Sequence, residues 1–345
     1  MFKSKIIIKK KFDTELKEKW YQLEKESQIS FFQTYDWQEY WYNICGVNLD
    51  LYIILFYKNE ELVSILPLNI KKSFLKILNW NGFPFSDYNQ PILKTNYHLK
   101  LNDFKFIISQ LREIVKFDNI HFINNINPHY LDDTIKINNI SYQLMFTRNE
   151  QQHNIIQKLK NKIKYEYRKL KINYNLEINL NPTKHEKKNI LNFFITQKTK
   201  QLNRTNAWNY LNIKKYKNYI NNLLDYNNKN ITFSCLKIEN KIISAHIGYV
   251  YNNIFYYIFP VYDNDYKKYS PGNILLCELL ENCQTENFKS FDFTIGSEAY
   301  KTKLNNKSCE IIEYISSETI LGYTYYFLIK LKIFLKKLIK KKYFK

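Results

Sequence analysis

Four consecutive residues, Ser270 to Asn273, stand where a chain could bind a phosphorylated ligand. The apolar stretch Ile254–Phe259 predicts a strand, and the polar loop that follows it ends at Ser270-Pro271-Gly272. Leucines then recur at helical spacing, so a helix is expected to begin near Asn273. The first amides of a helix lack partners and carry the positive end of its dipole, which suits a diphosphate. Pro and Gly also mark ordinary helix starts, so both interpretations stay open.

Three further side chains could take part in proton transfer. Asp87 lies in a loop rich in Gly, Pro and aromatic residues, which suits contact with a substrate, although aspartate is also a common turn former. Asp292 alternates with Phe291 and Phe293 in a predicted strand, so its carboxylate points away from two core residues and could equally be structural. His246 also lies in a predicted strand, where a hydrogen-bonded core imidazole is the simpler expectation.

Helices and strands are expected to alternate along the whole chain and to position these residues. Hydrophobic periodicity predicts strands at 5–9, 51–57, 62–70, 74–80, 120–123, 142–146, 175–180, 231–238, 241–249, 254–259 and 290–294. It predicts helices at 13–26, around Trp37 and Trp41, and at 102–116, 153–170, 183–200, 214–225 and from 273 onward.

Two strand–turn–strand stretches resemble each other. Phe56–Pro67 reads FYKNEELVSILP and Leu236–Ile247 reads LKIENKIISAHI, with Ser64 aligned to Ser244. Hairpins are often alike, so one match is weak evidence. Because the two stretches lie about half the chain apart, they nevertheless favour a duplicated α/β domain.

Length and composition favour a two-domain globular protein with a basic surface. The chain has 345 residues, of which 45% are hydrophobic and 17% aromatic, so it can bury large cores. Its formal net charge is +20, which suits nucleic acid, an anionic membrane or phosphorylated substrates. The residues that dominate, Lys, Asn, Ile, Tyr and Phe, also share A/T-rich codons, so genome composition is an alternative cause of the charge.

The cysteines and the apolar runs indicate a cytoplasmic setting. The five cysteines are odd in number, widely spread and contain no C-x-x-C pair, so neither a metal site nor a disulfide framework is expected. A reducing cytoplasm is the simplest compartment. The apolar run near the N-terminus is too short for a signal peptide, and no run has the length of a membrane span.

Two lysine-rich segments could contact anionic partners. The predicted helix 153–170 carries many basic residues and could line a phosphate site, although a solvated face is the usual reason for such a run. The segment 322–345 combines an apolar stripe with eight lysines and no acid. Such a helix can lie on an anionic membrane surface, or its stripe can pack on the body of the protein.

Several short patterns occur in an order that resembles one family. They are Phe31 to Trp41, Ser86-Asp87-Tyr88 to Pro91, Tyr167-Arg168-Lys169-Leu170, Ile243-Ser244-Ala245, Lys268-Tyr269-Ser270-Pro271-Gly272, and Phe291-Asp292-Phe293 with Gly296 to Lys301. Together they resemble the GNAT-superfamily acyltransferases of the CelD-like group, which are related to the FemAB peptidoglycan aminoacyltransferases. The resemblance covers about residues 25–315, and its last two patterns are the most specific.

The resemblance implies an α/β (α+β) fold of tandem GNAT-like domains, each with a mixed, mostly antiparallel sheet flanked by helices. The expected boundaries are 1–150 for the first domain, 151–320 for the second, which holds the donor site, and 321–345 for a basic amphipathic helix. It also implies transfer of an acyl group from a thioester, or from an aminoacyl-tRNA in FemAB relatives, to an amine. The donor's diphosphate would bind at Tyr269, Ser270, Gly272 and Asn273, although the usual Gly-x-Gly is absent.

The resemblance assigns further roles at matching positions. The predicted catalytic residues are Lys301, Asp292, Asp87 and Tyr269, with Lys301 stabilising charge. Tyr269 could donate to the leaving group or could equally be a packed aromatic residue. Glu298 and His246 are further candidates for the base. The predicted substrate-binding residues are Arg168, Asp87, Tyr88, Tyr300 and Glu298, with Arg168 suited to an acceptor phosphate through its planar fork.

The sequence therefore predicts a metal-free N-acyltransferase with acyl-CoA as co-substrate and no permanently bound cofactor. Its acceptor is expected to be an amino sugar or another cell-envelope or polysaccharide precursor. A FemAB-like aminoacyl-tRNA-dependent transferase is one alternative, with tRNA as the partner. A non-catalytic GNAT-fold module that binds phosphorylated glycan or nucleic acid is the other. The protein is expected in the cytoplasm, with peripheral membrane contact through its C-terminal helix left open.

Overall fold

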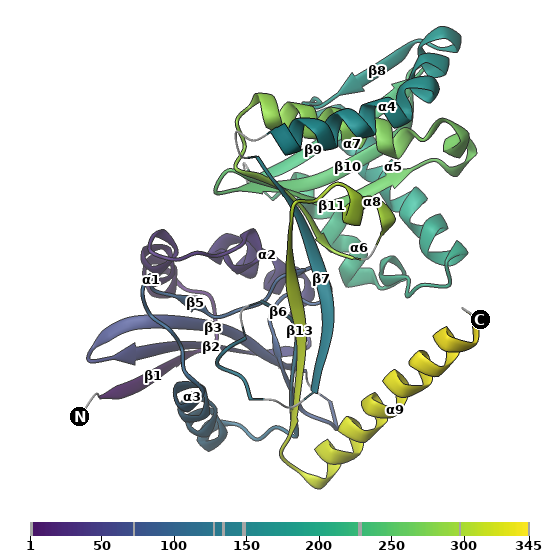
Figure 1. Cartoon of the computed structure of the whole chain (residues 1–345). Coiled ribbons are helices and arrows are strands. Elements are labelled where there is room, and N and C mark those ends of the chain that lie inside the picture. The colour runs from purple at the N-terminus through teal and green to yellow at the C-terminus, as the bar shows by residue number, and fades with distance from the viewer. Residues whose placement is uncertain are drawn as a thin grey trace. The chain divides into compact units, whose positions relative to one another are not determined.

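The chain forms two structural units in the computed structural model (Figure 1). Unit one comprises residues 1–139 and 310–345, and unit two comprises residues 140–309. The structure describes residues 3–71, 73–126, 128–132, 135–146, 150–226, 230–296 and 298–343, without the side chains at 135–138, 150–153 and 332–343. The division predicted from the sequence, at 1–150, 151–320 and 321–345, stays a prediction about which segments fold by themselves.

Unit one is a sheet flanked by helices. Its elements are β1 (Ser4–Lys9), α1 (Thr14–Lys25), α2 (Tyr35–Cys45), β2 (Leu49–Lys58), β3 (Glu61–Lys71), β4 (Ile77–Trp80), β5 (Ile92–Leu93), α3 (Leu101–Ile114), β6 (Asn119–Asn125), β13 (Lys307–Ser317) and α9 (Ile320–Tyr343). The strand order is β1-β2-β3-β4-β6-β13, with β5 on β3. Neighbours are antiparallel except for β4 and β6.

Unit two repeats this arrangement. Its elements are β7 (Ile135–Met145), α4 (Glu150–Asn173), β8 (Leu176–Asn179), α5 (Lys184–Arg204), α6 (Lys214–Asn221), β9 (Ile231–Ile238), β10 (Lys241–Tyr251), β11 (Ile254–Tyr262), α7 (Pro271–Thr285), β12 (Ser290–Ile295) and α8 (Ala299–Lys303). The strand order is β7-β12-β11-β10-β9-β8, and β11 and β12 are the parallel pair. The predicted class, a mixed and mostly antiparallel sheet with flanking helices, is confirmed.

The two similar sequence stretches form hairpins with the same irregularity. In both hairpins, β2–β3 and β9–β10, the register shifts by one residue just before the aligned serine. The second strand of each hairpin has one extra residue there, Val63 before Ser64 and Ile243 before Ser244. Both turns place two residues at positive φ, namely Asn59 and Glu60 in the first and Glu239 and Asn240 in the second. Such turns match the twist of paired strands and set the register locally.

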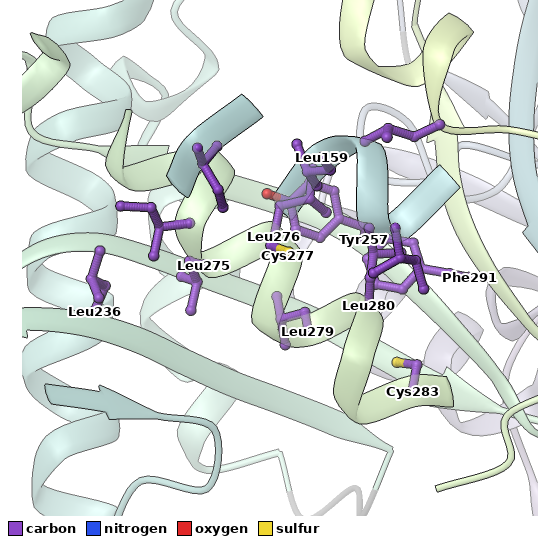
Figure 2. Packing of buried hydrophobic residues seen from close by; sticks show 14 of the residues in the cluster. Leu159, Leu236, Tyr257, Leu275, Leu276, Cys277, Leu279, Leu280, Cys283 and Phe291 are labelled. Carbon is purple, nitrogen blue, oxygen red and sulfur yellow. The ribbon is translucent and has the colours of Figure 1, made fainter. Parts of the chain in front are cut away.

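The core of unit two lies between its sheet and two helices. Figure 2 shows side chains of α7, among them Leu275, Leu276 and Leu280, gathered with Tyr257 and Phe291 of the sheet. Helix α4 adds its own apolar face to the same cluster through Ile156, Leu159, Ile163 and Leu170. Because buried apolar area is the main stabilising term in folding, this packing fixes α7 over the sheet.

Helix α1 illustrates how the local sequence sets an element's start. Asp13 is its N-cap, and the carboxylate accepts a hydrogen bond from the Leu16 amide at 2.8 Å. This bond satisfies one of the amides that a helix leaves open at its first turn.

In the part of the chain that the structure describes, no helix has the length and apolar character needed to cross a bilayer.

Candidate functional site

Strands β11 and β12 separate after a short parallel contact. They pair only from Ile254 to Tyr256 on β11, opposite Ser290 to Asp292 on β12. Beyond this point β11 continues to Tyr262, paired with β10 alone. The described pairing of β11 with β12 therefore does not extend over 257–262. Alternate N–H groups along the edge of a strand can donate hydrogen bonds to a ligand.

A bulge lies at the point where the strands separate. Ile247 of β10 pairs with Phe259, but Tyr249 pairs with Tyr256, so β11 carries one extra residue between them. A bulge bends a strand and redirects its side chains. As a result Tyr257 joins the cluster under α7, whereas Phe259 packs against Phe194 of α5.

The Lys301 side chain contacts the last residue of β12. Its Nζ donates to the carbonyl oxygen of Ile295 at 2.8 Å and lies 3.1 Å from Oε2 of Glu298. The lysine is only 4% exposed, whereas the side chain of Glu298 is 57% exposed. A Cβ at Gly296, where φ is +143°, would stand 2.8 Å from this Nζ, so the glycine makes room for the ammonium. An ammonium has three N–H donors, which leaves Lys301 one more for a ligand.

Two tyrosines accompany Lys301. Phe293 of β12 contacts the rings of both Tyr257 and Tyr300 edge to face. Burial raises the pKa of each tyrosine, and the charge of Glu298 acts in the same direction. Both hydroxyls are therefore protonated at neutral pH and able to donate hydrogen bonds or a proton. The structure thus brings together three residues predicted separately, Lys301, Tyr300 and Glu298.

Asp292 points away from this group. Its carboxylate accepts hydrogen bonds from Nε2 of Gln143 at 2.8 Å and from the amide of Thr294 at 2.7 Å. The second bond holds Thr294 at a φ of +57°. Asp292 is 1% exposed. These contacts describe a carboxylate that fixes the end of β12, and its part in proton transfer stays a prediction.

The amino end of α7 lies at the same edge of the sheet. Because β11 and β12 are parallel, their carboxyl ends share one edge, and α7 begins beside the last residue of β11, Tyr262, whose ring a Cβ at Gly272 would meet at 3.4 Å. The amides of Asn273 and Ile274 both donate to the carbonyl of Ser270. Pro271 has no N–H, so among the described residues of this turn the Gly272 amide has no internal partner.

Ser270 and Tyr269 shape the approach to this helix. Ser270 adopts the left-handed conformation at a φ of +51° and is the N-cap position of α7. The ring of Tyr269 packs at the edge of the core against Tyr174, and the Nζ of Lys268 lies 5.0 Å from its centroid. A hydrogen bond from Tyr174 lowers the pKa of Tyr269, and Lys268 acts in the same direction.

Arg168 lies on the solvent side of α4. Leu170 and Ile163 of this helix are buried in the core, whereas Arg168 and Lys169 are exposed. Lys169 is close enough to Tyr269 to favour its ionised form. The basic face of α4 therefore adds positive charge beside the start of α7, as expected for a site that attracts anions.

Asp87 and Tyr88 belong to unit one, whereas the residues described above belong to unit two. Tyr88 is 3% exposed and meets the ring of Phe32 edge to face. The Ser86 hydroxyl donates to the Tyr88 carbonyl at 2.8 Å. The loop that carries Asp87 is thus fixed by its neighbours, and its contact with a substrate stays a prediction.

The expectation for His246 is wrong in one respect. The imidazole is 1% exposed, but neither ring nitrogen has a hydrogen-bond partner among the described residues. Burial lowers the pKa of His246 to about 3, so the ring is neutral and too weak a base for proton transfer at neutral pH.

Comparison with protein families finds a match, which concerns unit two. Residues 157–302 match the acetyltransferase (GNAT) domain family. The match lies within unit two and spans less than half of the chain. The predicted enzyme class, a GNAT-type acyltransferase, is confirmed by this match, while membership of the CelD-like group stays a prediction. A search of the curated proteins finds none that matches the chain.

Solved structures share the fold over nearly the whole chain. FemX has a TM-score of 0.58 at 10% identity, covering 94% of this chain and 99% of its own. A C-terminal domain from Agrobacterium fabrum, assigned to a putative lysylphosphatidylglycerol synthetase, has a TM-score of 0.54 at 11% identity, covering 90% and 94%. A tandem GNAT protein from the clavulanic acid biosynthesis pathway has a TM-score of 0.52 at 8% identity, covering 91% and 98%. At such low identity these likenesses concern the fold alone.

Sequence reasoning missed one residue of the candidate site. Tyr257 was counted only as part of an apolar strand, because a tyrosine between aromatic residues looks like core. Its place at the separation of β11 and β12 depends on the bulge, and nothing in the local pattern indicates the extra residue. The proline at 260 is the single sequence signal that this strand is irregular.

Proposed function

We propose that the protein is an N-acyltransferase that moves an acyl group from acyl-CoA to the amine of an amino sugar or another cell-envelope precursor. The observation that carries the proposal is the opening between β11 and β12, with Lys301 at one strand end and the start of α7 at the other. Coenzyme A is a cytoplasmic molecule, so we place the reaction in the cytoplasm.

The donor would dock by its phosphates and its amide arm. The Gly272 amide and the dipole of α7 would hold the diphosphate, supported by Ser270, Asn273 and Tyr269 around the same turn. The edge of β11 beyond its short contact with β12 would accept the extended arm as an added strand, which would place the thioester carbonyl in the opening. A backbone N–H on this edge would then face the carbonyl oxygen.

Transfer requires that the amine loses a proton, that its nitrogen bonds to the carbonyl carbon and that the C–S bond breaks. Glu298, exposed at the mouth of the opening, is our candidate for accepting the proton. Lys301 and a β11 amide would stabilise the oxyanion. Tyr300 or Tyr257, both protonated, would deliver a proton to the departing thiolate. Arg168, Asp87 and Tyr88 remain proposed contacts to the acceptor.

A charged tRNA is the second candidate donor, and one observation favours it. Pro271 removes an amide from the turn where GNAT enzymes bind a diphosphate, so this chain offers fewer donors to coenzyme A. The exposed basic face of α4 would suit a nucleic acid backbone. The fold shared with FemX and with the lysylphosphatidylglycerol synthetase domain is compatible with this alternative. Here the ester C–O bond would break and the ribose oxygen would leave.

The deciding experiment measures thermal unfolding with and without acetyl-CoA for three proteins: wild type, Gly272→Glu and Gly272→Ala. Ligand at about 100-fold above Kd adds ~2.7 kcal/mol, which raises the midpoint of a unit of this size by roughly 5–10 °C. A Cβ at position 272 meets Tyr262 at ordinary contact distance, so the alanine variant should fold and keep the shift. The glutamate variant should lose the shift because its carboxylate repels the diphosphate.

The same experiment can reject acyl-CoA as donor. A wild-type protein that shows no shift at millimolar acetyl-CoA, or a shift that survives Gly272→Glu, would contradict the proposal. Binding of tRNA that weakens steeply with salt would then make the aminoacyl-tRNA reaction the working hypothesis.

A further inference from the structure

Helix α9, the yellow helix that follows β13 in Figure 1, is attached to unit one through its first turns. Gly322 lies so close to the backbone of Asp118 that a Cβ there would clash, and its carbonyl accepts from Nδ2 of Asn119 at 3.0 Å. The Tyr325 hydroxyl hydrogen-bonds to Nδ1 of His121 at 3.1 Å. These contacts fix which side of the helix faces the unit.

The apolar stripe of α9 lies on the other side. Successive residues turn by about 100° around a helix, so Leu331 lies opposite Gly322. Leu331 is 41% exposed, Leu328 56% and Phe327 64%, and Ile320 at the start of the helix is 89% exposed. Among the described residues, therefore, the stripe does not pack on unit one. The sequence repeats the apolar spacing at 334, 335 and 338, whose side chains lie outside the described residues.

The charge around the stripe has one sign. Residues 320–345 contain eight lysines and no acidic residue, and Lys330 is exposed beside the apolar stripe. Lysines that flank an apolar face can extend toward phosphate groups while their methylenes cover apolar surface. A second copy of α9 would bring eight further lysines against these, so like charges oppose pairing of two such helices.

We propose that α9 docks this protein on an anionic lipid bilayer, with Phe327, Leu328 and Leu331 inserted at the headgroup boundary and the lysines on the lipid phosphates. The combination of an exposed apolar stripe, flanking lysines and no acid matches a helix that lies in the membrane interface. The inference does not depend on the proposed reaction, because α9 belongs to unit one and the reaction site to unit two.

The test is co-sedimentation of the full chain with vesicles of pure phosphatidylglycerol and of pure phosphatidylcholine. Wild type should sediment with the anionic vesicles, weakly or not at all with the neutral ones, and less as salt increases. The triple variant F327S/L328S/L331S should bind anionic vesicles at least about tenfold more weakly. The three side chains are exposed, so the variant should fold normally, as circular dichroism would verify.

A matched triple variant controls for general stickiness. Val47, Phe74 and Ile114 are exposed apolar residues elsewhere in unit one, and V47S/F74S/I114S should bind vesicles like wild type. The proposal is overturned if wild type ignores phosphatidylglycerol vesicles, or if the α9 triple variant and wild type bind them equally. It is also overturned if light scattering without lipid shows a dimer that the α9 triple variant dissolves, because the stripe would then be covered by a second copy.

Discussion

The imidazole of His246 stacks on the ring of Tyr257, with centroids 4.4 Å apart and ring planes 13° apart. His246 pairs across the strands with Ser234, whose hydroxyl likewise has no partner among the described residues. A neutral imidazole with no hydrogen bond acts mainly as a flat ring that stacks on its neighbour. It therefore supports Tyr257, at the point where β11 and β12 separate, by packing and not by proton transfer.

The stability of unit two should fall in acid because of His246. The pKa of its imidazole is about 3 in the folded protein, against an ordinary value of 6.5, so the unfolded chain binds a proton that the folded one does not. This contribution is complete above about pH 6.5 and decreases as the pH falls toward 3. Between pH 7 and pH 5 it should cost roughly 2 kcal/mol.

The variant His246→Phe isolates this effect. Phenylalanine keeps a flat ring against Tyr257 but cannot bind a proton. The difference in free energy of unfolding between variant and wild type should therefore change by roughly 2 kcal/mol between pH 7 and pH 5. Any packing cost of the larger ring is independent of pH and cancels in that comparison. Urea unfolding at pH 7 and pH 5 measures the free energy of unfolding of each protein. An equal pH dependence in both proteins would show that His246 does not titrate as described.

Lys301→Met should impair catalysis more than binding. The ammonium lies where charge develops in the proposed reaction, so kcat should fall by about 10²–10³-fold with little change in KM for the donor. The Ile295 carbonyl also loses its donor, which should cost about 1–3 kcal/mol of stability. The assay is release of free coenzyme A in the presence of an amino sugar.

Lys303→Met is the control for Lys301, because it removes an exposed lysine from the same short helix. It should leave both rate and stability near the wild-type values. If Lys301→Met lowered stability but retained the rate, the lysine would hold the end of β12 without taking part in the reaction.

Asp292→Asn should destabilise unit two by about 1–3 kcal/mol. The single oxygen of the new amide can still accept from the Thr294 amide, but its NH₂ group would then face the NH₂ of Gln143. The double variant D292N/Q143E restores a donor opposite an acceptor and should recover both stability and rate. Denaturant unfolding measures the first and coenzyme A release the second. A rate that stays low in the double variant would instead favour Asp292 as the catalytic base.

Local patterns predicted much of this fold. Asp13 precedes an apolar periodic stretch and is the N-cap of α1, and the similar hairpins at 56–67 and 236–247 have the same bulge and turn geometry. Helix caps, turns and the alternation of apolar and polar residues in strands depend on neighbours in sequence, so they can be predicted without a structure. The acyltransferase fold was also indicated by motifs near Gly272 and Lys301.

What the sequence did not reveal depends on distant contacts. Strand β13 was missed because KSCEIIEYISS alternates poorly, and helix α8 has too few turns to show a period. The separation of β11 from β12 arises from a register that the two strands adopt only when paired. The orphaned nitrogens of His246 follow from what surrounds them in space, and a histidine in a strand carries no signal of that.

The discontinuous chain of unit one has a consequence for its synthesis. β6 pairs with β13, which the ribosome makes only after nearly all of unit two has been synthesised. The usual order, in which the N-terminal domain folds first, is thus reversed for the last step. All strands of unit two precede the last strand of unit one in synthesis, so unit one must wait, with one edge of β6 uncovered, until β13 has been made and has left the ribosome.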